Sequence, residues 1–204
     1  LASPLLLIND STDNRIAVHD KYGIKLINAN GKYIKLATEE PIATMTGLIA
    51  DSGRSTTAYI RTKNGKVARI DFSKRKIDFI LSEDSIIDLT CTRTGSGKTR
   101  LITVDTSGIQ VRSTDGALQQ IISSPFKNKV MIQGNTEESI NFWGLLNPKE
   151  NQMAAFDLNG MLLPGFPVAG GIGYDVIRNQ KDDSSIGIVV TSMDGTILLY
   201  AVQR

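Results

Sequence analysis

One short run in the chain has the residue types of a phosphate-binding loop, TGSGKT at residues 94–99. Such a loop needs the pattern G-x-x-x-x-G-K-[ST] between a strand and a helix, so that helix amides and the lysine converge on the phosphates. Counted back from Gly97, the first glycine position is occupied by Thr92. The residues after Thr99, RLITVDTSG, are typical of a strand that ends in a turn. The sequence therefore predicts no nucleotide site here and no cofactor.

The single histidine and the single cysteine are the next candidates for chemistry. His19 ends the apolar run 16–18, and no pattern around it supplies the partners of a catalytic triad. Cys91 lies between two threonines in a strand-like run, which predicts a small core residue and not a nucleophile. No common zinc or hydrolase template occurs in the chain. We therefore predict structural roles for both residues and no catalytic residue.

Acidic turns could hold calcium, and the best candidates are Asp10 with Asp13 and Asp182 with Asp183. Calcium loops place several oxygen ligands at alternating positions. The run DSTDN at residues 10–14 breaks that spacing. We therefore predict solvated turns and no metal site.

Composition excludes two classes of partner. The 204 residues carry a formal net charge of +2, which is too weak to steer nucleic acid toward the chain. No apolar stretch approaches the ~20 residues that a membrane-spanning helix needs. We therefore predict no nucleic-acid partner and no membrane span in this segment.

Turn sequences recur at a regular spacing along the chain. Gly23, Gly65 and Gly108 lie 42 and 43 residues apart, and Gly195 follows after two more such steps. The missing member of the series falls on Asn151, and asparagine is the residue that best tolerates the left-handed conformation after glycine. This period indicates a repeat architecture.

A second turn series runs in parallel with the first. It contains Gly31, Gly116 and Gly160, and its skipped member falls on the polar run 73–76. Asn-Gly and Asp-Gly between apolar runs are hairpin signals, because both central residues of a type I′ turn need a positive φ.

The segments between the turns are short and rich in β-branched residues, as four runs near residues 86–123 show. Four strands in every ~40–45 residues are the signature of propeller blades. We therefore predict an all-β fold, a single β-propeller domain over residues 1–204 with about five four-stranded blades of ~43 residues. The predicted units are about 1–40, 41–84, 85–127, 128–170 and 171–204, and the last has only three strands.

The most distinctive phrase in the chain is DLNGMLLPGFPV at residues 157–168. It resembles the blade ending D-x-x-G-x-x-L-P-G-F-P of bacterial extracytoplasmic β-propellers allied to the integrin-type and quinoprotein-like groups. The run DGTILLY at residues 194–200 resembles the closing strand of such proteins. The resemblance implies a propeller in the periplasm or at the cell surface. It carries over no catalytic residue. The calcium loops and the tryptophan-docking motifs of those groups are not matched, which argues against their ligands. Phe166 within the phrase is a candidate interaction residue, although packing against the next blade is the favoured reading.

Two functions stay open at this point. The first is a non-catalytic binding or scaffolding module that contacts a protein partner through loop rims such as residues 37–45, 123–129 and 167–173. The second is a glycan-acting hydrolase or another enzyme, which needs two carboxylates some ~5–10 Å apart. Asp88 and Asp175 lie on predicted first strands, which line a propeller channel, so they are the pair to test. We favour binding, because no convergent set of catalytic residues can be named.

The incomplete last unit predicts open strand edges. Residues 1–3 are too short to supply its missing fourth strand. We therefore expect either the C-terminal part of a longer propeller or a chain that pairs its open edges with another copy of itself as a homo-oligomer.

Overall fold

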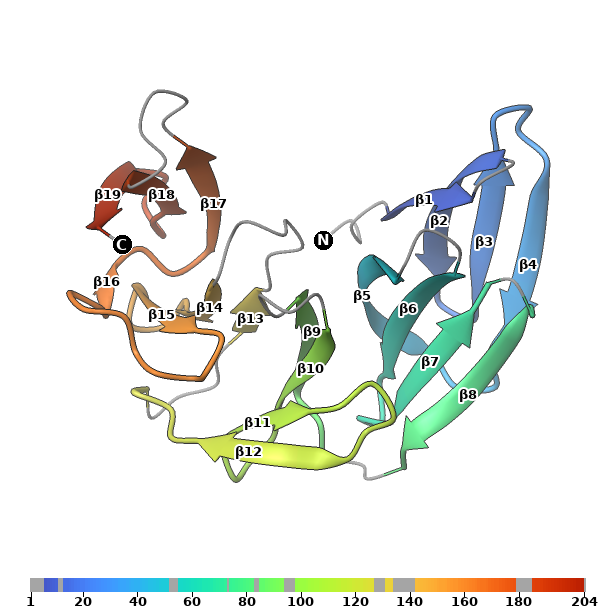
Figure 1. Ribbon diagram of the computed structural model, residues 1–204, viewed down its shortest axis with the longest axis horizontal. Helices are drawn as coiled ribbons and strands as arrows, with labels where there is room; N and C mark the ends of the chain where they lie inside the picture. The colour runs from blue at the N-terminus through green and yellow to red at the C-terminus, as the bar shows by residue number, and fades with distance from the viewer. Residues whose placement is uncertain are drawn as a thin grey trace. The chain divides into compact units, whose positions relative to one another are not determined.

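The computed structural model describes residues 6–10, 13–51, 55–72, 74–82, 85–93, 98–126, 131–133, 142–178 and 185–203. Within these ranges the chain forms 19 strands and no helix, arranged as five antiparallel sheets in chain order (Figure 1). The first four sheets have four strands each and the fifth has three. The predicted all-β class, the four-stranded repeat and the three-stranded last unit are therefore confirmed. In the described part of the chain, no helical segment has the length and apolarity that a membrane crossing needs.

The chain divides into two compact units, the first with three sheets and the second with two. The strands of the first unit are β1 (Leu6–Asp10), β2 (Asp13–Asp20), β3 (Gly23–Asn28), β4 (Tyr33–Ala37), β5 (Ile42–Asp51), β6 (Ser55–Thr62), β7 (Val67–Asp71), β8 (Lys76–Leu81), β9 (Asp88–Arg93), β10 (Thr99–Val104), β11 (Ile109–Arg112) and β12 (Leu118–Ile122). The strands of the second unit are β13 (Met131–Gln133), β14 (Phe142–Asn147), β15 (Gln152–Asp157), β16 (Val168–Ala169), β17 (Gly173–Arg178), β18 (Ser185–Thr191) and β19 (Ile197–Gln203). In every sheet the strands follow one another in sequence order, so each sheet is a meander of hairpins.

The second sheet of the first unit is apolar on both faces, because it packs against a sheet on each side. Ile60 of β6 belongs to a core cluster that it shares with Ile24 and Leu26 of the first sheet. The next residue back, Tyr59, belongs to a different cluster, shared with Leu89 and Leu101 of the third sheet. Successive side chains of a strand point to opposite faces, so one strand contributes to both cores.

Aromatic residues fill the core of the second unit. Trp143 and Phe156 are cross-strand partners of β14 and β15, and their rings stack with centroids 4.4 Å apart. Phe142 of the fourth sheet stacks on Tyr174 of the fifth with centroids 5.9 Å apart. The contact of Phe142 with Tyr174 buries the facing surfaces of the two sheets on each other, while Trp143 and Phe156 lie on the other face of the fourth sheet.

The glycines of the hairpin turns have the positive φ that their positions predict, but the type I′ prediction is wrong, because the residues before them, such as Asn30 and Asn64, do not have a positive φ. Gly65, Gly108 and Gly195 have φ values of 89°, 141° and 84°. Asn151 has a φ of 52°, so the prediction that it replaces glycine in the series is confirmed. Gly23 differs, because it opens β3 opposite Asp20, where a Cβ would lie 2.8 Å from the carbonyl oxygen of Leu36.

The skipped member of the second turn series is also left-handed. Gly31, Gly116 and Gly160 have positive φ values, and Arg75, in the polar run, has a φ of 54°. The turn therefore keeps the conformation of its series although it lacks glycine.

Candidate functional site

The phosphate-loop candidate continues into a strand. Residues 94–97 lie outside the described residues, and Thr99 begins β10, where it pairs with Arg93 of β9. A nucleotide-binding loop needs a helix at this point, with its amides directed at the phosphates. The predicted strand is confirmed, so the residues after Lys98 do not form the helix that such a loop needs.

Asp88 and Asp175 both lie on first strands of their sheets, as predicted. Asp88 is half-buried at the start of β9, and its Oδ1 accepts a hydrogen bond from the Leu89 amide at 2.9 Å. Burial lowers the pKa of the Arg61 guanidinium, and the charge of Asp88 opposes that shift. Asp175 is exposed, and its Oδ1 accepts from the Val176 amide at 2.8 Å. The two carboxylates belong to different compact units, and their pairing at a channel stays a prediction.

Phe166 lies in the turn of the distinctive phrase. Its amide donates to the carbonyl oxygen of Leu163 at 3.2 Å, its peptide bond to Pro167 is cis, and its side chain is half-buried. The choice between interaction and packing for this ring stays a prediction.

The acidic pairs that could hold calcium lie outside what the structure describes, since Asp182 and Asp183 and the side chains of Asp10 and Asp13 are not included.

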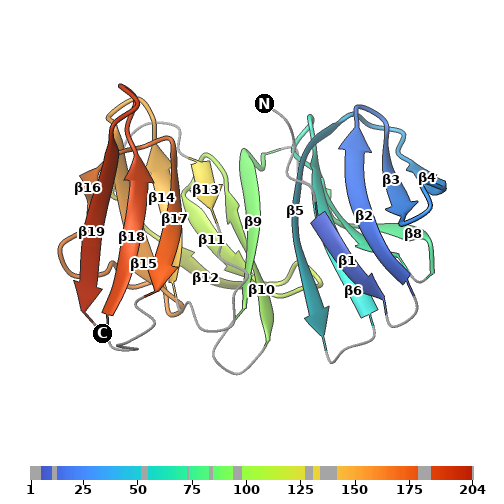
Figure 2. The same ribbon diagram turned by 90° about the horizontal axis from the view of Figure 1, so that it is seen from above.

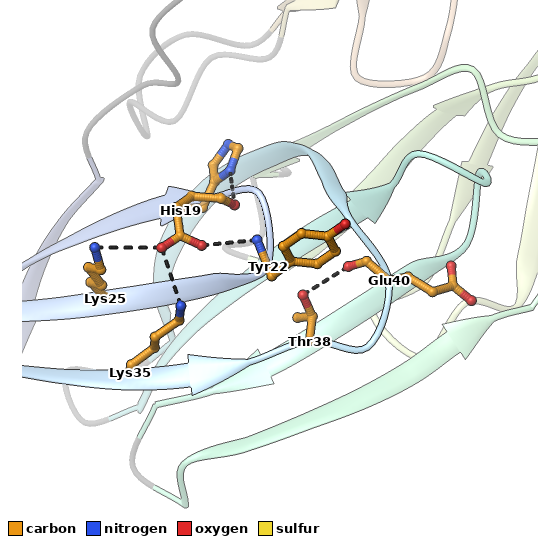
Figure 3. A network of polar contacts seen from close by, with 7 residues as sticks. His19, Tyr22, Lys25, Lys35, Thr38 and Glu40 are labelled. Atoms are coloured by element: carbon orange, nitrogen blue, oxygen red, sulfur yellow. Dashed lines mark hydrogen bonds and ion pairs between the residues drawn. The ribbon is translucent and has the colours of Figure 1, made fainter.

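A network of polar contacts that the sequence did not predict lies on the first two sheets (Figure 3). Three segments form it, namely the β2–β3 turn (20–23), the β4–β5 connection (38–41) and the β6–β7 turn (62–66), and we call them the polar rim. Main-chain hydrogen bonds join these segments: Thr38 N to Tyr22 O at 3.1 Å, Ile42 N to Lys21 O at 2.9 Å and Lys63 N to Pro41 O at 2.8 Å. The β4–β5 connection is thus fixed to both turns.

Asp20 is the centre of the first half of the polar rim. Its Oδ1 accepts from the Tyr22 amide at 2.9 Å, and its Oδ2 lies 3.5 Å from Lys25 Nζ and 3.4 Å from Lys35 Nζ (Figure 3). The hydrogen bond from the Tyr22 amide and then the two ammonium groups hold the pKa of Asp20 below its ordinary value. Lys25 of β3 and Lys35 of β4 are direct cross-strand partners, and like charges in such a pair repel each other. The carboxylate of Asp20 offsets this repulsion, because it lies near both ammonium groups.

Glu40 is the centre of the second half of the polar rim. Lys66 Nζ donates to Glu40 Oε1, and this bond is the main reason why the pKa of Glu40 lies below its ordinary value. The Thr38 hydroxyl donates to the Glu40 carbonyl oxygen at 2.9 Å (Figure 3). Glu40 Oε2 is buried and accepts no hydrogen bond from the described residues. The ion pair of Glu40 with Lys66 of the second sheet therefore fixes the connection between the first two sheets.

His19 is a structural neighbour of this network. Its Nδ1 donates to the carbonyl oxygen of Asp20 at 3.3 Å, and its Nε2 is buried without a partner among the described residues (Figure 3). It lies at the end of β2, as the sequence predicted. A general base needs a reacting group within hydrogen-bond reach, and among the described residues no nucleophile lies within that distance of the His19 ring.

Aromatic rings with cations beside them form the exposed part of the polar rim and of the first sheet. Tyr22 is 45% exposed, with Lys21 Nζ 4.8 Å from its ring centroid. Tyr33 is 62% exposed, with Lys25 Nζ 5.8 Å from its ring centroid. Exposed tyrosines on a rigid sheet suit recognition of a protein surface, because they bury a large area with few rotatable bonds.

The hairpin register was the signal that could have found this site. The hairpin loop consists of residues 29–31 and ends in the left-handed Gly31, so Lys25 and Lys35 lie at equal distances on either side of its central residue, Asn30. Pairing outward from the turn places the two lysines opposite each other. The ion pair of Glu40 with Lys66 has no such local signal, because it joins two different sheets.

Comparison with known proteins defines the class of fold. No protein-family model and no curated protein sequence matches the chain. Two crystal structures of BBS1N in complex with ARL6DN, soaked with mercury and with lead, match 100% of the chain with TM-scores of 0.71 and 0.69 and 8% identity in each case. The crystal structure of the N-terminal domain of Nup159 matches 98% of the chain with a TM-score of 0.57 and 9% identity.

The chain therefore has the fold of a β-propeller, because these similar structures are β-propellers. At identities of 8% and 9% the similarity shows the fold alone. The chain spans 66% of the length of the two BBS1N chains and 60% of the Nup159 chain.

Proposed function

We propose that this chain is a non-catalytic β-propeller module that binds a protein partner through its loop rims. The observation that carries the proposal is the polar rim, where the exposed Tyr22 with Lys21 beside it lies next to a connection fixed at both ends. The first sheet adds the exposed Tyr33 with Lys25 beside it. A partner would therefore meet an ordered surface and lose little entropy in binding. The BBS1N propeller, similar in fold, was crystallised in complex with a protein, ARL6DN, which supports a binding role.

The charges of the polar rim favour selective binding over strong binding. The three segments of the polar rim contain three acids and three lysines, so the rim has little excess charge to attract any anion. Paired charges at the edge of an interface orient a partner and reject others, while the aromatic rings contribute most of the affinity. The connections 123–129 and 167–173, the latter with Phe166, are further contact segments under this proposal.

Two narrower statements belong to the same proposal. The blade phrase at residues 157–168 supports a relation to extracytoplasmic propellers of the integrin-type and quinoprotein-like kind, and with it a periplasmic or cell-surface location. The alternative function is a glycan-acting hydrolase with Asp88 and Asp175 as its acids. The hydrogen bonds that both carboxylates accept from the amides of the next residues do not favour it.

The test places a photo-reactive residue at the proposed contact surface. p-Benzoylphenylalanine replaces Tyr22 or Tyr33 in separate variants, and Met161, an exposed turn residue of the fourth sheet, is the control position. In cells that naturally produce the chain, we expect one discrete protein crosslinked from positions 22 and 33 and not from 161.

The crosslinked protein is then purified and its affinity measured. Tyr22→Ala together with Tyr33→Ala should weaken binding at least ~10-fold, the effect of losing ~1.4 kcal/mol at an interface. Equal crosslinking from all three positions, or unchanged affinity of the double variant, would contradict the proposal.

A further inference from the structure

Three turns of the chain contain an asparagine followed by glycine, a dipeptide that can react with itself. They are Asn30-Gly31 between β3 and β4, Asn64-Gly65 between β6 and β7, and Asn159-Gly160 between β15 and β16. All three asparagines are exposed. Glycine has no Cβ to shield its main-chain nitrogen, so this nitrogen can reach the side-chain carbonyl carbon of the asparagine before it. Of the three, Asn64 is the one that lies in the polar rim, on a sheet that lies between the first and third sheets of its unit (Figure 2).

The glycine amide is hydrogen-bonded in each of the three turns. These bonds are Gly31 N to Asn28 O at 2.9 Å, Gly65 N to Thr62 O at 3.1 Å and Gly160 N to Asp157 O at 3.0 Å. The nitrogen must leave this bond before it can attack, so each turn reacts only after it opens locally. Gly65 is buried and Gly31 is exposed, but opening is required of both. The hydrogen bonds that resist opening therefore decide which asparagine reacts first.

The residue that begins each turn sets the number of these further bonds. In the turns of Asn30 and Asn159, the Oδ1 atom of the first residue accepts from two amides. These bonds are Asn30 N and Lys32 N to Asn28 at 3.1 and 3.0 Å, and Asn159 N and Met161 N to Asp157 at 2.9 and 2.8 Å. Both turns are thus held at the amide of the asparagine itself.

The turn of Asn64 has one bond fewer. It begins with Thr62, whose hydroxyl lies closer to the main chain and accepts from the Lys66 amide at 3.2 Å. The amide of Asn64 has no acceptor among the residues that the structure describes. This turn therefore opens more often than the other two.

We propose that Asn64 is a site of spontaneous modification, which the native protein converts to aspartate and isoaspartate faster than Asn30 or Asn159. The main-chain nitrogen of Gly65 attacks Cγ of Asn64, and the new C–N bond closes a cyclic imide. The side-chain nitrogen leaves as ammonia and takes the proton of the Gly65 amide with it. Water then opens the ring: cleavage at Cγ gives aspartate, and cleavage at the main-chain carbonyl carbon gives isoaspartate. The reaction needs no oxidant or reductant.

Either product adds a carboxylate to the polar rim, next to Lys63 and near Lys66 in the sequence. The acids and lysines of the three rim segments are equal in number, so the new charge gives the rim an excess of negative charge. Lys66 already donates to Glu40, and the new carboxylate is a second acceptor for it. The proposal concerns the chain alone and does not depend on the binding of a partner.

The test incubates the full chain at pH 8 in water enriched in heavy oxygen, which labels each new carboxylate. Peptide mapping by mass spectrometry then measures the rate at each of the three asparagines. In the native protein Asn64 should react ~5-fold faster than Asn30, the effect of one hydrogen bond fewer on the population of the open turn. In guanidinium the three asparagines should react at similar rates, because the same dipeptide is then free in each.

Asn28→Thr is the matched variant, because it gives the turn of Asn30 the same first residue as the turn of Asn64. The rate at Asn30 should rise toward that at Asn64, while the rate at Asn159 should stay as in the wild type. Equal native rates at Asn30 and Asn64 would overturn the proposal. So would a lead of Asn64 that persists in guanidinium, or an unchanged rate at Asn30 in the folded variant. The wild-type comparison decides the proposal even where the variant does not fold.

Discussion

Cys91 is the only thiol of the chain and is 1% exposed in the core between the second and third sheets. Burial raises its pKa to about 12, and a weak hydrogen bond with the Thr46 hydroxyl opposes the shift. We expect a thiol reagent at pH 8 to label the native protein slowly and the denatured protein at once. Absorbance of the released chromophore with and without guanidinium measures this difference. Stoichiometric labelling of the native chain within minutes would place Cys91 at the surface instead.

Gly144 of β14 lies against the ring of Tyr174. A Cβ at this position would be 2.2 Å from Cε1 and 2.9 Å from Cδ1 of that ring. Because the tyrosine is buried and cannot move aside, Gly144→Ala should lower the free energy of unfolding by ~1–3 kcal/mol. Urea denaturation followed by the fluorescence of Trp143, the single tryptophan, measures the change.

The matched background for this variant is Tyr174→Leu. If the ring is the obstacle, the added cost of Gly144→Ala should fall below ~1 kcal/mol there, because contacting residues are coupled. An equal cost in both backgrounds would assign the effect to the backbone of β14.

Glu40 gives the polar rim a defined pH dependence. Its pKa in the folded chain lies below the ordinary value of 4.5, first because Lys66 donates to it. The folded chain therefore binds this proton less readily than the unfolded chain does. The stabilisation is present above pH 4.5 and is lost as the pH falls through the folded pKa. The measurement is the urea midpoint of unfolding as a function of pH. Glu40→Gln should make this midpoint fall less steeply below pH 4.5 than it does in the wild type. Glu39→Gln, at an exposed neighbouring position, is the control and should leave the pH dependence of the midpoint as in the wild type.

At the scale of the element, Asn151 joins two hairpin turns of the second unit. Its Nδ2 donates to Ser192 Oγ at 2.7 Å, and its Oδ1 accepts from that hydroxyl at 3.1 Å and from the Met193 amide at 3.0 Å. The residue thus combines the left-handed backbone of its own turn with a bridge to the turn of the fifth sheet. Arg75 has nearly the same φ, 54° against 52°, and its side chain is exposed.

The same substitution at these two turns should have opposite results. Asn151→Gly keeps the conformation and removes the bridge, so it should cost ~1–2 kcal/mol. Arg75→Gly relieves a left-handed conformation that disfavours side chains and should leave stability unchanged or raise it by up to ~1 kcal/mol. Chemical denaturation followed by circular dichroism measures both. A loss at Arg75 as large as that at Asn151 would show that the bridge contributes nothing.

Most of the elements could be predicted because their signals are local. Asparagine or glycine at the turn positions favours a positive φ, and β-branched runs between them favour strands, so β10 and β11 lie where the sequence placed them. The polar rim could be predicted only in part. Lys25 and Lys35 follow from one hairpin register, but the contact of Glu40 with Lys66 depends on how two sheets pack.

At the scale of the whole molecule, the exposed face of the fifth sheet should govern the behaviour of the protein in solution. The net charge of +2 opposes association only weakly. Ile197→Lys with Leu199→Lys should reduce the fluorescence of bound anilinonaphthalene sulfonate and raise solubility, with a stability change under ~0.5 kcal/mol because both residues are exposed. Met193→Lys, in the adjacent turn, is the control. A thermal midpoint several degrees lower in the double variant would mean that these residues are covered in solution.

The sequence by itself determined the all-β class, the spacing of the turns, the left-handed residue at position 151 and the missing fourth strand of the last unit. Each of these follows from the conformational preferences of a few neighbouring residues. Tertiary structure alone decided that Glu40 holds Lys66, that Asn151 bridges to Ser192 and that β19 leaves Leu199 exposed. Those outcomes join residues of different sheets, or depend on what covers a sheet, and local preferences do not specify the packing of one sheet on the next.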